Sequence, residues 1–248
     1  MINPMDLSNK HIIITGASSG IGRACAIQAS RLGAKVTIIA RSEDRLKETI
    51  SLMEGSSKHA YYVFDLNHIE EIEALIKKNV TEQGAVDGLC HAAGIANMRT
   101  LKFSNPQYVK KMFNIHIFAF VELVRVLSLK HNLNDAASLV GISSVVAERG
   151  NTAQGIYGAA KGAMNSFIKP VAKELAIRKI RINNVAYGMV DTQMYQEFLE
   201  TGGDEDVIEQ QQYLGLIDTE TAANAVMFLL SDASKFTTGS IIPVYAGY

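Results

Sequence analysis

Cysteine and proline are scarce in this 248-residue chain, which contains two cysteines and four prolines. Both cysteines, Cys25 and Cys90, lie in apolar segments, so we expect buried free thiols rather than a disulfide or a nucleophile. The six histidines are scattered, and no cysteine cluster accompanies them. The sequence therefore predicts no structural or catalytic metal.

An excess of charge of either sign is also absent, because 24 basic and 25 acidic side chains leave a net charge of -1. This balance gives no electrostatic reason to expect nucleic acid or a membrane surface as a partner. No uninterrupted apolar run is long enough to cross a bilayer, and the first ten residues lack the basic start and apolar core of a signal peptide. We therefore expect a cytoplasmic protein.

Short β-branched runs alternate along the chain with longer segments of helical periodicity, and no repeat or Pro/Ser-rich linker divides them. This pattern predicts a single α/β domain over residues 1–248, a doubly wound (Rossmann) parallel sheet of about seven strands with helices on both faces. The predicted strands are 12–15, 35–40, 61–65, 88–92, 138–143, 181–186 and 241–244. The predicted helices are 21–32, 43–53, 69–82, 106–129, 157–178 and 219–230.

Residues 189–214 lack clear periodicity, which in a compact fold is typical of a substrate lid or binding loop. Its apolar side chains would cover a hydrophobic or moderately polar molecule. All of its charges are negative, so its field should repel phosphorylated sugars and acidic carrier proteins, unless it is an ordinary solvated face. A basic rim for such a carrier could still come from Arg99, Lys102, Arg149 and Arg178.

A glycine-rich turn, TGASSGIG over residues 15–22, follows the first predicted strand and runs straight into a helix. Gly16 permits the sharp turn, Gly20 lets a phosphate approach the backbone, and Gly22 lets the helix begin close to the sheet. The free N–H groups and the positive dipole of the helix N-terminus then suit a pyrophosphate. A merely structural turn is the alternative.

The end of the second predicted strand distinguishes between the two nicotinamide dinucleotides. About 20 residues past the glycine turn an acidic side chain would bind the ribose 2′-hydroxyl of NAD, but Arg41 and Ser42 stand there instead. Arg41 offers a planar charged fork for a 2′-phosphate, with Ser42 and Ser18 as hydroxyl donors. NADP(H) is favoured, unless Arg41 is a solvated strand-end residue. Asp65 would accept from the adenine amino group or cap the following helix.

Tyr157 and Lys161 are four residues apart in a predicted helix, so their side chains lie on one face. A phenol has a pKa of about 10, and an ammonium group one turn away favours the phenolate. The pair would then donate and accept protons in carbonyl and alcohol chemistry. On its own, the spacing is also compatible with a solvated helix face.

Together these motifs resemble those of the compact, single-domain short-chain dehydrogenases/reductases, and the likeness spans nearly the whole chain. The family's T-G-x-x-x-G-x-G matches residues 15–22, and its Y-x-x-x-K matches Tyr157 and Lys161. Its serine, thirteen residues before the tyrosine, falls on Ser144 rather than on Ser143. Its asparagine after strand four fits Asn114. The stretches 184–192 and 228–239 resemble N-x-V-x-P-G-x-V-x-T and the family's C-terminal pattern.

The resemblance implies an NADP(H)-dependent oxidoreductase that interconverts a ketone and a secondary alcohol, as carbonyl reductases and 3-oxoacyl-acyl-carrier-protein reductases do. Tyr157 would protonate the carbonyl oxygen as hydride arrives from the nicotinamide, while Lys161 lowers the pKa of Tyr157 and binds the nicotinamide ribose. Ser144 would stabilise the developing charge, unless it is a turn hydroxyl. Asn114 would hold a water linking Lys161 to solvent, or else bond a neighbouring strand.

The remaining implications concern the cofactor and assembly. Family members commonly form homotetramers, so we expect a dimer or tetramer. Val190 and Thr192 would meet the nicotinamide carboxamide. The cofactor-binding residues expected from the residue patterns and the resemblance are Gly16, Ser18, Ser19, Gly20, Ile21, Gly22, Arg41, Ser42, Asp65, Leu66, Ala92, Ala93, Gly94, Tyr157, Lys161, Gly188, Val190 and Thr192.

The chain departs from the family pattern at three places. His91 and Ala92 replace the two asparagines of N-N-A-G, which removes an amide that usually ties the central strands together. Tyr187 replaces the proline before Gly188, which should loosen the start of the lid and put a bulky ring near the cofactor. Residues 246–248 replace an acidic D-G-G. These departures leave open a cofactor-binding sensor or scaffold without turnover, whereas sugar epimerisation is disfavoured because the chain lacks room for an added substrate domain.

Overall fold

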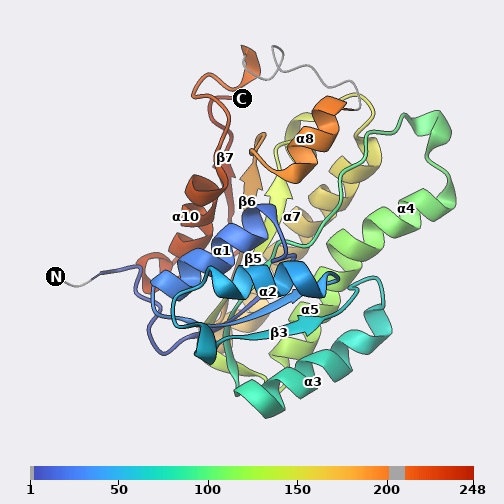
Figure 1. Ribbon diagram of the computed structural model, residues 1–248. Coiled ribbons are helices and arrows are strands. Elements are labelled where there is room, and N and C mark those ends of the chain that lie inside the picture. The colour runs from blue at the N-terminus through green and yellow to red at the C-terminus, as the bar shows by residue number, and fades with distance from the viewer. Residues whose placement is uncertain (1–2, 201–209) are drawn as a thin grey trace.

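The computed structural model describes residues 3–200 and 210–248, which contain a seven-stranded parallel sheet in the order β3-β2-β1-β4-β5-β6-β7 (Figure 1). Each neighbouring pair of strands is parallel. The chain winds from β1 toward β3 on one side and from β4 toward β7 on the other, so the order reverses between β1 and β4. This arrangement confirms the predicted doubly wound class. The strands are β1 His11–Thr15, β2 Lys35–Ala40, β3 Ala60–Val63, β4 Val86–His91, β5 Leu133–Ser144, β6 Arg181–Tyr187 and β7 Ile241–Val244.

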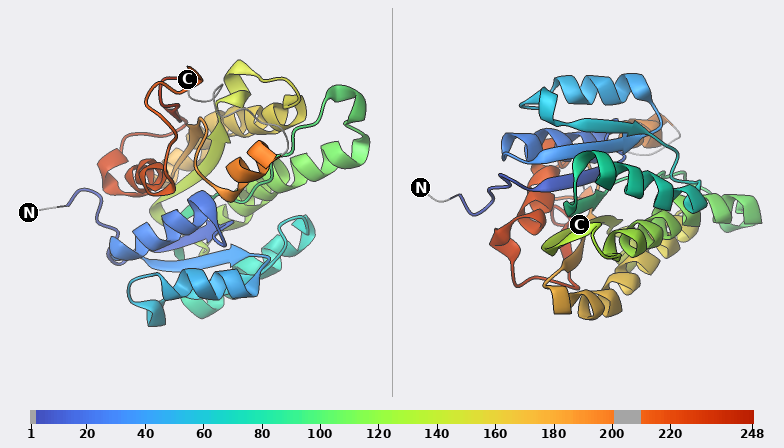
Figure 2. Two further views of the ribbon diagram at one scale, coloured as in Figure 1. Left: turned by 45° about the horizontal axis from the view of Figure 1, so that its top comes forward. Right: turned by 90° about the horizontal axis from the view of Figure 1, so that it is seen from below.

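Helices cover both faces of this sheet (Figure 2). On one face pack α1 Gly20–Arg31, α2 Glu43–Ser51 and α10 Thr219–Leu230. On the other pack α3 Ile72–Gln83, α4 Pro106–Phe113, α5 Ala119–Ser128 and α7 Gly155–Leu175. The shorter α6 Val146–Arg149 and α8 Gln193–Glu200 follow β5 and β6. The 3-10 turns are Ser56–Lys58, Ile69–Glu71, Leu101–Phe103, Ala176–Arg178 and Asp232–Ser234.

The side chains of β1 show why the sheet needs two helical layers. All five residues of the strand are buried. Ile12 and Ile14 belong to the apolar layer of α1 and α10, whereas Ile13 belongs to that of α5 and α7. Such strands read as continuous apolar runs because neither face meets water. Cys25 and Cys90 lie in the first layer as buried free thiols, as predicted.

The predicted helix 106–129 differs from the structure in its interior. Residues Asn114–Phe118 form a π-helical turn between α4 and α5. A π turn inserts one residue into a helix, and such turns are frequent at functional sites. The turn therefore gives Asn114 a backbone setting that the sequence periodicity did not indicate.

The carboxyl ends of the strands form the edge on which α8 and the C-terminal residues lie, at the top of Figure 1. In doubly wound sheets ligands bind outside this edge, at the point where the strand order reverses. No helix of the described residues is long and apolar enough to cross a membrane.

Candidate active site

The glycine turn after β1 is shaped by close backbone approaches. Gly16 and Gly20 have positive φ angles of +69° and +53°. A Cβ on Gly16 would lie 2.6 Å from the backbone nitrogen of Ala93, and one on Gly22 would collide with the carbonyl oxygen of Gly16. Glycine is therefore required by the turn itself and by the segment after β4, which packs directly against it.

The start of α1 presents unpaired backbone donors at this turn. The N–H of Arg23 donates to the carbonyl of Ser19 at 3.1 Å and closes the first helical turn. The N–H groups of Gly20, Ile21 and Gly22 precede that bond, so they have no acceptor within the helix. A Cβ on Gly20 would meet the Thr192 methyl group at 3.3 Å, so the segment after β6 lies beside the turn. This cradle fits an anionic pyrophosphate.

Arg41 extends from the end of β2 into solvent, and no ion pair engages it in residues 3–200 or 210–248. Asp65, two residues past β3, accepts from the backbone nitrogen of Asn67 at 2.9 Å and from its side-chain nitrogen at 2.8 Å. Partial burial raises the pKa of Asp65, but these hydrogen bonds and the charge of Arg41 outweigh it, so the net pKa is lowered. Asp65 thus closes a local turn and does not cap the helical turn at 69–71, whose cap position is His68.

Ser144, Tyr157 and Lys161 come together from the end of β5 and the first turns of α7. The Lys161 ammonium donates to the carbonyl of Ile142 at 2.7 Å and lies 5.6 Å from the centroid of the Tyr157 ring. The Ser144 hydroxyl acts to lower the pKa of Tyr157, so it lies close to the phenol, and its oxygen accepts from the backbone nitrogen of Val146 at 3.3 Å. The neighbouring Ser143 hydroxyl is buried without a partner among the described residues. The geometry therefore favours Ser144 over Ser143.

Burial is the main cause of the pKa shifts of Tyr157 and Lys161. The Tyr157 ring keeps part of its surface exposed, but packing around the rest raises its pKa to about 12, and the Ser144 hydrogen bond opposes the shift. Lys161 is only 5% exposed, and burial lowers its pKa to about 7. The predicted lowering of the Tyr157 pKa by Lys161 is therefore wrong for the chain alone, because burial disfavours both charged forms.

Asn114 begins the π turn and remains partly exposed. Its side chain makes no hydrogen bond to any residue that the structure describes, and the Lys161 ammonium is directed at Ile142 instead. Sequence reasoning placed Asn114 after strand four correctly. The water link to Lys161 stays a prediction.

His91 restores the tie that the missing asparagine was expected to remove. Its Nδ1 lies 2.9 Å from the Thr15 hydroxyl, and its Nε2 lies 3.1 Å from the carbonyl of Ile115. These contacts join β1, β4 and the π turn. The prediction that the central strands lose this tie is therefore wrong, because an imidazole supplies it.

The Tyr187 side chain is part of the apolar core. The ring is buried in the layer of α1 and α10, and its hydroxyl donates to the carbonyl of Ala222 at 2.5 Å. With 2% of its surface exposed, the Tyr187 ring is enclosed in the core, and its nearness to a bound cofactor stays a prediction.

The start of the lid is held by a residue that the sequence did not single out. Gln212, only 1% exposed, donates to the carbonyls of Met189 and Gly215 at 3.1 Å each and accepts from the backbone nitrogen of Met189. Val190 also pairs with Ile217 in a parallel bridge. The predicted loosening at residue 187 is therefore wrong as well. The Gln212 amide bonds both backbone groups of Met189, a residue far away in the chain, so it has no local sequence pattern.

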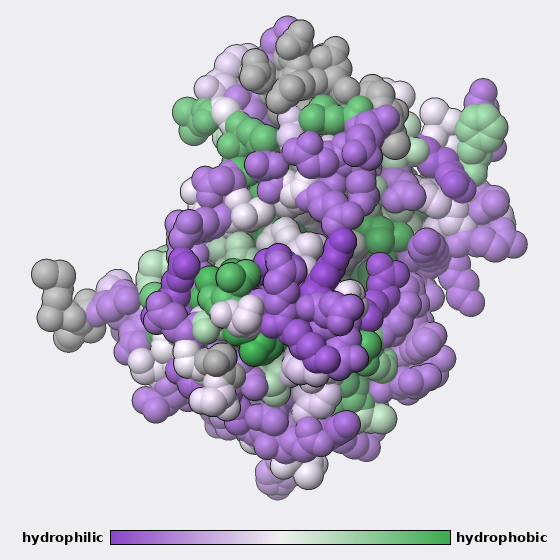
Figure 3. Space-filling model, in the orientation of Figure 1, coloured by the Kyte–Doolittle hydropathy of each residue, from purple (hydrophilic) through white to green (hydrophobic). Residues whose placement is uncertain are grey.

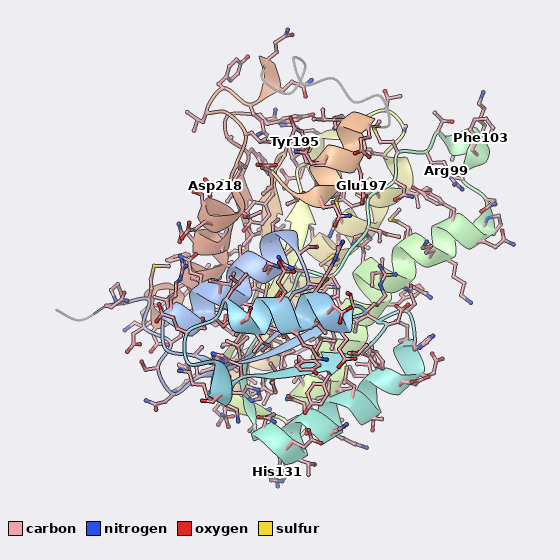
Figure 4. The ribbon with its side chains drawn as sticks, in the orientation of Figure 1. Arg99, Phe103, His131, Tyr195, Glu197 and Asp218 are labelled. Atoms are coloured by element: carbon pink, nitrogen blue, oxygen red, sulfur yellow. The ribbon has the colours of Figure 1, made fainter. Side chains whose placement is uncertain are left out.

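The rest of the lid and rim is only partly as predicted. Figure 4 shows Tyr195 and Glu197 on α8. The lid acids Asp191 and Glu200 are also described, whereas residues 201–209, with the remaining four lid acids, lie outside the described residues. Arg178 pairs with Asp135 at 2.8 Å near the amino end of β5, so it is not part of a basic rim. Arg99 and Phe103 mark the tip of a protrusion before α4, where Figure 3 shows apolar surface.

A cavity of about 490 Å³ lies beside the glycine turn. It is lined by one face of α1, by residues 191–193 and 196, and by the start of α10. Gly20 and Thr192 border it, but no lining residue comes from α7. The cavity therefore adjoins the glycine turn without including Tyr157.

Known proteins match this chain along almost its full length. Residues 16–248 match the family model described as enoyl-(acyl carrier protein) reductase. A 3-oxoacyl-[acyl-carrier-protein] reductase of Thermotoga maritima is 31% identical over 98% of this chain and 99% of that protein. Carbonyl reductase family member 4 of Xenopus laevis is 29% identical over 96% of this chain and 98% of that protein.

Solved structures agree with these relatives. A short-chain dehydrogenase/reductase of Brucella melitensis, described as a glucose/ribitol dehydrogenase, superposes with a TM-score of 0.91 at 28% identity, covering 98% of this chain and 97% of the other. The chain therefore belongs to the short-chain dehydrogenase/reductase family, as an NAD(P)-dependent oxidoreductase acting on small molecules.

Proposed function

We propose that the protein interconverts a ketone and a secondary alcohol with NADP(H), and that Tyr157 is its general acid and base. The observation that carries the proposal is the meeting of Ser144, Tyr157 and Lys161 at the same sheet edge as the glycine turn. The turn fits a dinucleotide, because it combines unpaired N–H groups with positions where a Cβ would collide. The bound cofactor supplies or takes up the hydride.

The proton chemistry follows from burial. With a pKa of about 12, Tyr157 holds its proton at neutral pH and can give it to a carbonyl oxygen as the carbon receives hydride. The Ser144 hydroxyl, facing the same phenol, would donate to that oxygen and stabilise its developing charge. Lys161, with a pKa of about 7, can return a proton to Tyr157. Asn114 would hold the water that connects Lys161 to solvent.

Arg41 supports the choice of NADP(H). Its guanidinium is exposed where β2 ends, the place where an NAD-binding chain would offer a carboxylate. A guanidinium can bind a 2′-phosphate through paired hydrogen bonds. Thr192, beside Gly20, would meet the nicotinamide carboxamide.

A free ketone is the substrate that the lid favours. Asp191, Glu197 and Glu200 are negative, and no cation lies between residues 189 and 214. This charge disfavours an acidic carrier protein, although one relative is a 3-oxoacyl-[acyl-carrier-protein] reductase. The cytoplasmic location and a homodimer or homotetramer remain predictions.

The test measures NADPH oxidation with a panel of ketones in the wild-type protein and in Tyr157→Phe. Loss of the single hydroxyl should lower kcat by about 100-fold or more, because it removes the proton donor. Cofactor affinity, measured by calorimetry, should change little. Tyr62→Phe is the matched control, since the Tyr62 hydroxyl binds Glu82 at 2.6 Å on the α3 side and should not affect turnover.

Two outcomes would contradict the proposal. If Tyr157→Phe turns over ketones at the wild-type rate, Tyr157 is not the acid. If the wild type binds NADPH tightly but reduces no ketone, the protein is a sensor or scaffold on the same fold.

A further inference from the structure

Two buried histidines lie between the glycine turn and Tyr157, and the proton chemistry above uses neither of them. His91 ends β4 and His116 lies in the π turn, and each is only 1% exposed. A buried imidazole without a chemical task costs stability unless its nitrogens find partners. Their contacts therefore indicate what they do.

The hydrogen bonds of His91 fix its tautomer. The carbonyl of Ile115 can only accept, so the Nε2 of His91 carries the proton and donates to it at 3.1 Å. Its Nδ1 is then an acceptor and receives the Thr15 hydroxyl at 2.9 Å. The Thr15 oxygen in turn accepts from the backbone nitrogen of Ala93 at 3.3 Å. The His91 ring thus connects Thr15, which precedes Gly16, to Ile115, which follows Asn114.

His116 continues this connection to the phenol. Its Nε2 lies 2.8 Å from the carbonyl of Ile95 and so donates to it. Its ring meets the Tyr157 ring edge-on, with centroids 5.4 Å apart at 79°. A Cβ on Gly94 would lie 2.5 Å from its Cε1 carbon, so the ring occupies the space that this glycine leaves. His116 therefore packs between Gly94 and Tyr157.

Both rings are neutral at the pH of the cell. Burial, and secondarily the charge of Lys161, lowers the pKa of His91 to about 3 and lowers that of His116 well below its usual value. A neutral ring beside a protonated lysine does not repel it. The two histidines therefore act through hydrogen bonds and packing, not as acids or bases.

We propose that His91 and His116 are positioning residues that keep the glycine turn and the Tyr157 ring in a fixed position relative to each other. His91 joins Thr15 to the π turn, and His116, the next residue but one after Asn114, braces the Tyr157 ring. The inference rests on the proposed function for its effect on turnover. The imidazole of His91 suits the task because its two nitrogens reach partners on opposite sides. His116 acts through Nε2 and its ring alone, because its Nδ1 has no hydrogen-bond partner among the described residues.

The two nitrogens of His91 can be tested separately. In His91→Asn, the amide oxygen takes the place of Nδ1 and keeps the Thr15 contact, but the Ile115 contact is lost. In His91→Gln, the amide nitrogen takes the place of Nε2 and keeps the Ile115 contact, but the Thr15 contact is lost. His91→Leu loses both. We measure kcat and KM for a ketone, and the dissociation constant of NADPH by calorimetry.

Each variant has its own expected result. In His91→Asn, the NADPH dissociation constant should stay within about threefold of wild type, while kcat falls about tenfold. In His91→Gln, kcat should stay within about threefold while NADPH binds about tenfold more weakly. His91→Leu should show both losses. If Asn and Gln change the same parameter to the same extent, or if Leu changes neither, the proposal is overturned.

His11 provides the control for a purely structural role. Like His91 it is a buried histidine, but it lies in β1 at the amino end of the sheet. Its Nε2 lies 2.9 Å from the Thr37 hydroxyl and its Nδ1 3.3 Å from the carbonyl of Ala85. His11→Leu should lower the melting temperature and leave kcat and NADPH affinity within about threefold. An equal kinetic loss in His11→Leu would attribute the effect to general stability and overturn the proposal.

His116 is tested by its ring. His116→Phe keeps the edge contact with Tyr157, whereas His116→Ala removes it, so kcat should fall about tenfold more in Ala than in Phe. Equal values would overturn the role of the ring. If no ketone is turned over, the NADPH affinities of His91→Asn and His91→Gln still test the Thr15 contact, so failure of the proposed function is recognised separately.

Discussion

The charge on Lys161 should destabilise the fold at neutral pH, and Lys161→Met should remove that cost. Burial lowers the Lys161 pKa from 10.5 to about 7. A difference of about 3.5 units corresponds to roughly 5 kcal/mol at 1.36 kcal/mol per unit. Because the folded pKa lies below the unfolded one, the unfolded state binds more protons between about pH 7 and pH 10.5. The cost is therefore full below about pH 7 and disappears as the pH rises toward 10.5.

The assay compares urea unfolding of wild type and Lys161→Met by circular dichroism over a range of pH. The variant also loses the hydrogen bond to Ile142, but that loss shifts its curve by a nearly constant amount. The free energy of unfolding of wild type relative to the variant should rise by about 3 kcal/mol from about pH 6.5 to about pH 9.5. The high-pH titration of Tyr157 is common to both proteins. Parallel pH curves would refute the reasoning, because they would mean that the buried ammonium is not disfavoured.

Three further substitutions test other parts of the structure. Arg41→Ala should raise KM for NADPH by about tenfold and leave KM for NADH nearly unchanged. The control Lys47→Ala should change neither value, since Lys47 already pairs with Glu43. Equal effects of Arg41→Ala on both cofactors would contradict the 2′-phosphate contact. Asn79→Leu should raise the free energy of unfolding by about 1–2 kcal/mol in urea, because its buried amide has no partner among the described residues, and a lower midpoint would contradict this. Ala153→Gly should stabilise the fold by up to about 1 kcal/mol, because Ala153 has a φ of +64°. The control Ala147→Gly in α6 should destabilise the fold by about 0.5–1 kcal/mol. A loss of stability in both variants would exclude backbone strain at residue 153.

The elements that could be predicted from sequence are those whose signal is local. Strand 35–40 and helix 219–230 have the same bounds in the structure, because apolar periodicity and flanking polar residues define them without reference to the rest of the chain. The glycine turn was predictable for the same reason, since its three glycines lie within seven residues between a strand and a helix. The helical spacing of Tyr157 and Lys161 indicated the pair, the family resemblance indicated Ser144, and the fold brings Ser144 and Tyr157 together.

What escaped prediction depends on contacts between distant residues. Spacing shows that Lys161 is near Tyr157, but it does not show how deeply both are buried, and burial decides their pKa values. The partners of His91 and Gln212 lie far away in the chain, so neither side chain has a recognisable local pattern. The π turn inserts one residue into an otherwise helical segment, and the helical period continues on either side of it.

The departures from the family pattern change residues around the site rather than the residues proposed to carry out the reaction. The Tyr248 hydroxyl donates to Asn151 at 3.0 Å and that of Tyr245 to Glu148 at 2.9 Å, so the C-terminal residues dock on the segment that follows Ser144. His91 and Tyr187 likewise find buried partners of their own. None of these contacts engages the hydroxyl of Ser144 or Tyr157. The replaced residues therefore bear on how this edge is held together and on which substrate fits beside α6, while the hydroxyls of Ser144 and Tyr157 stay outside these contacts.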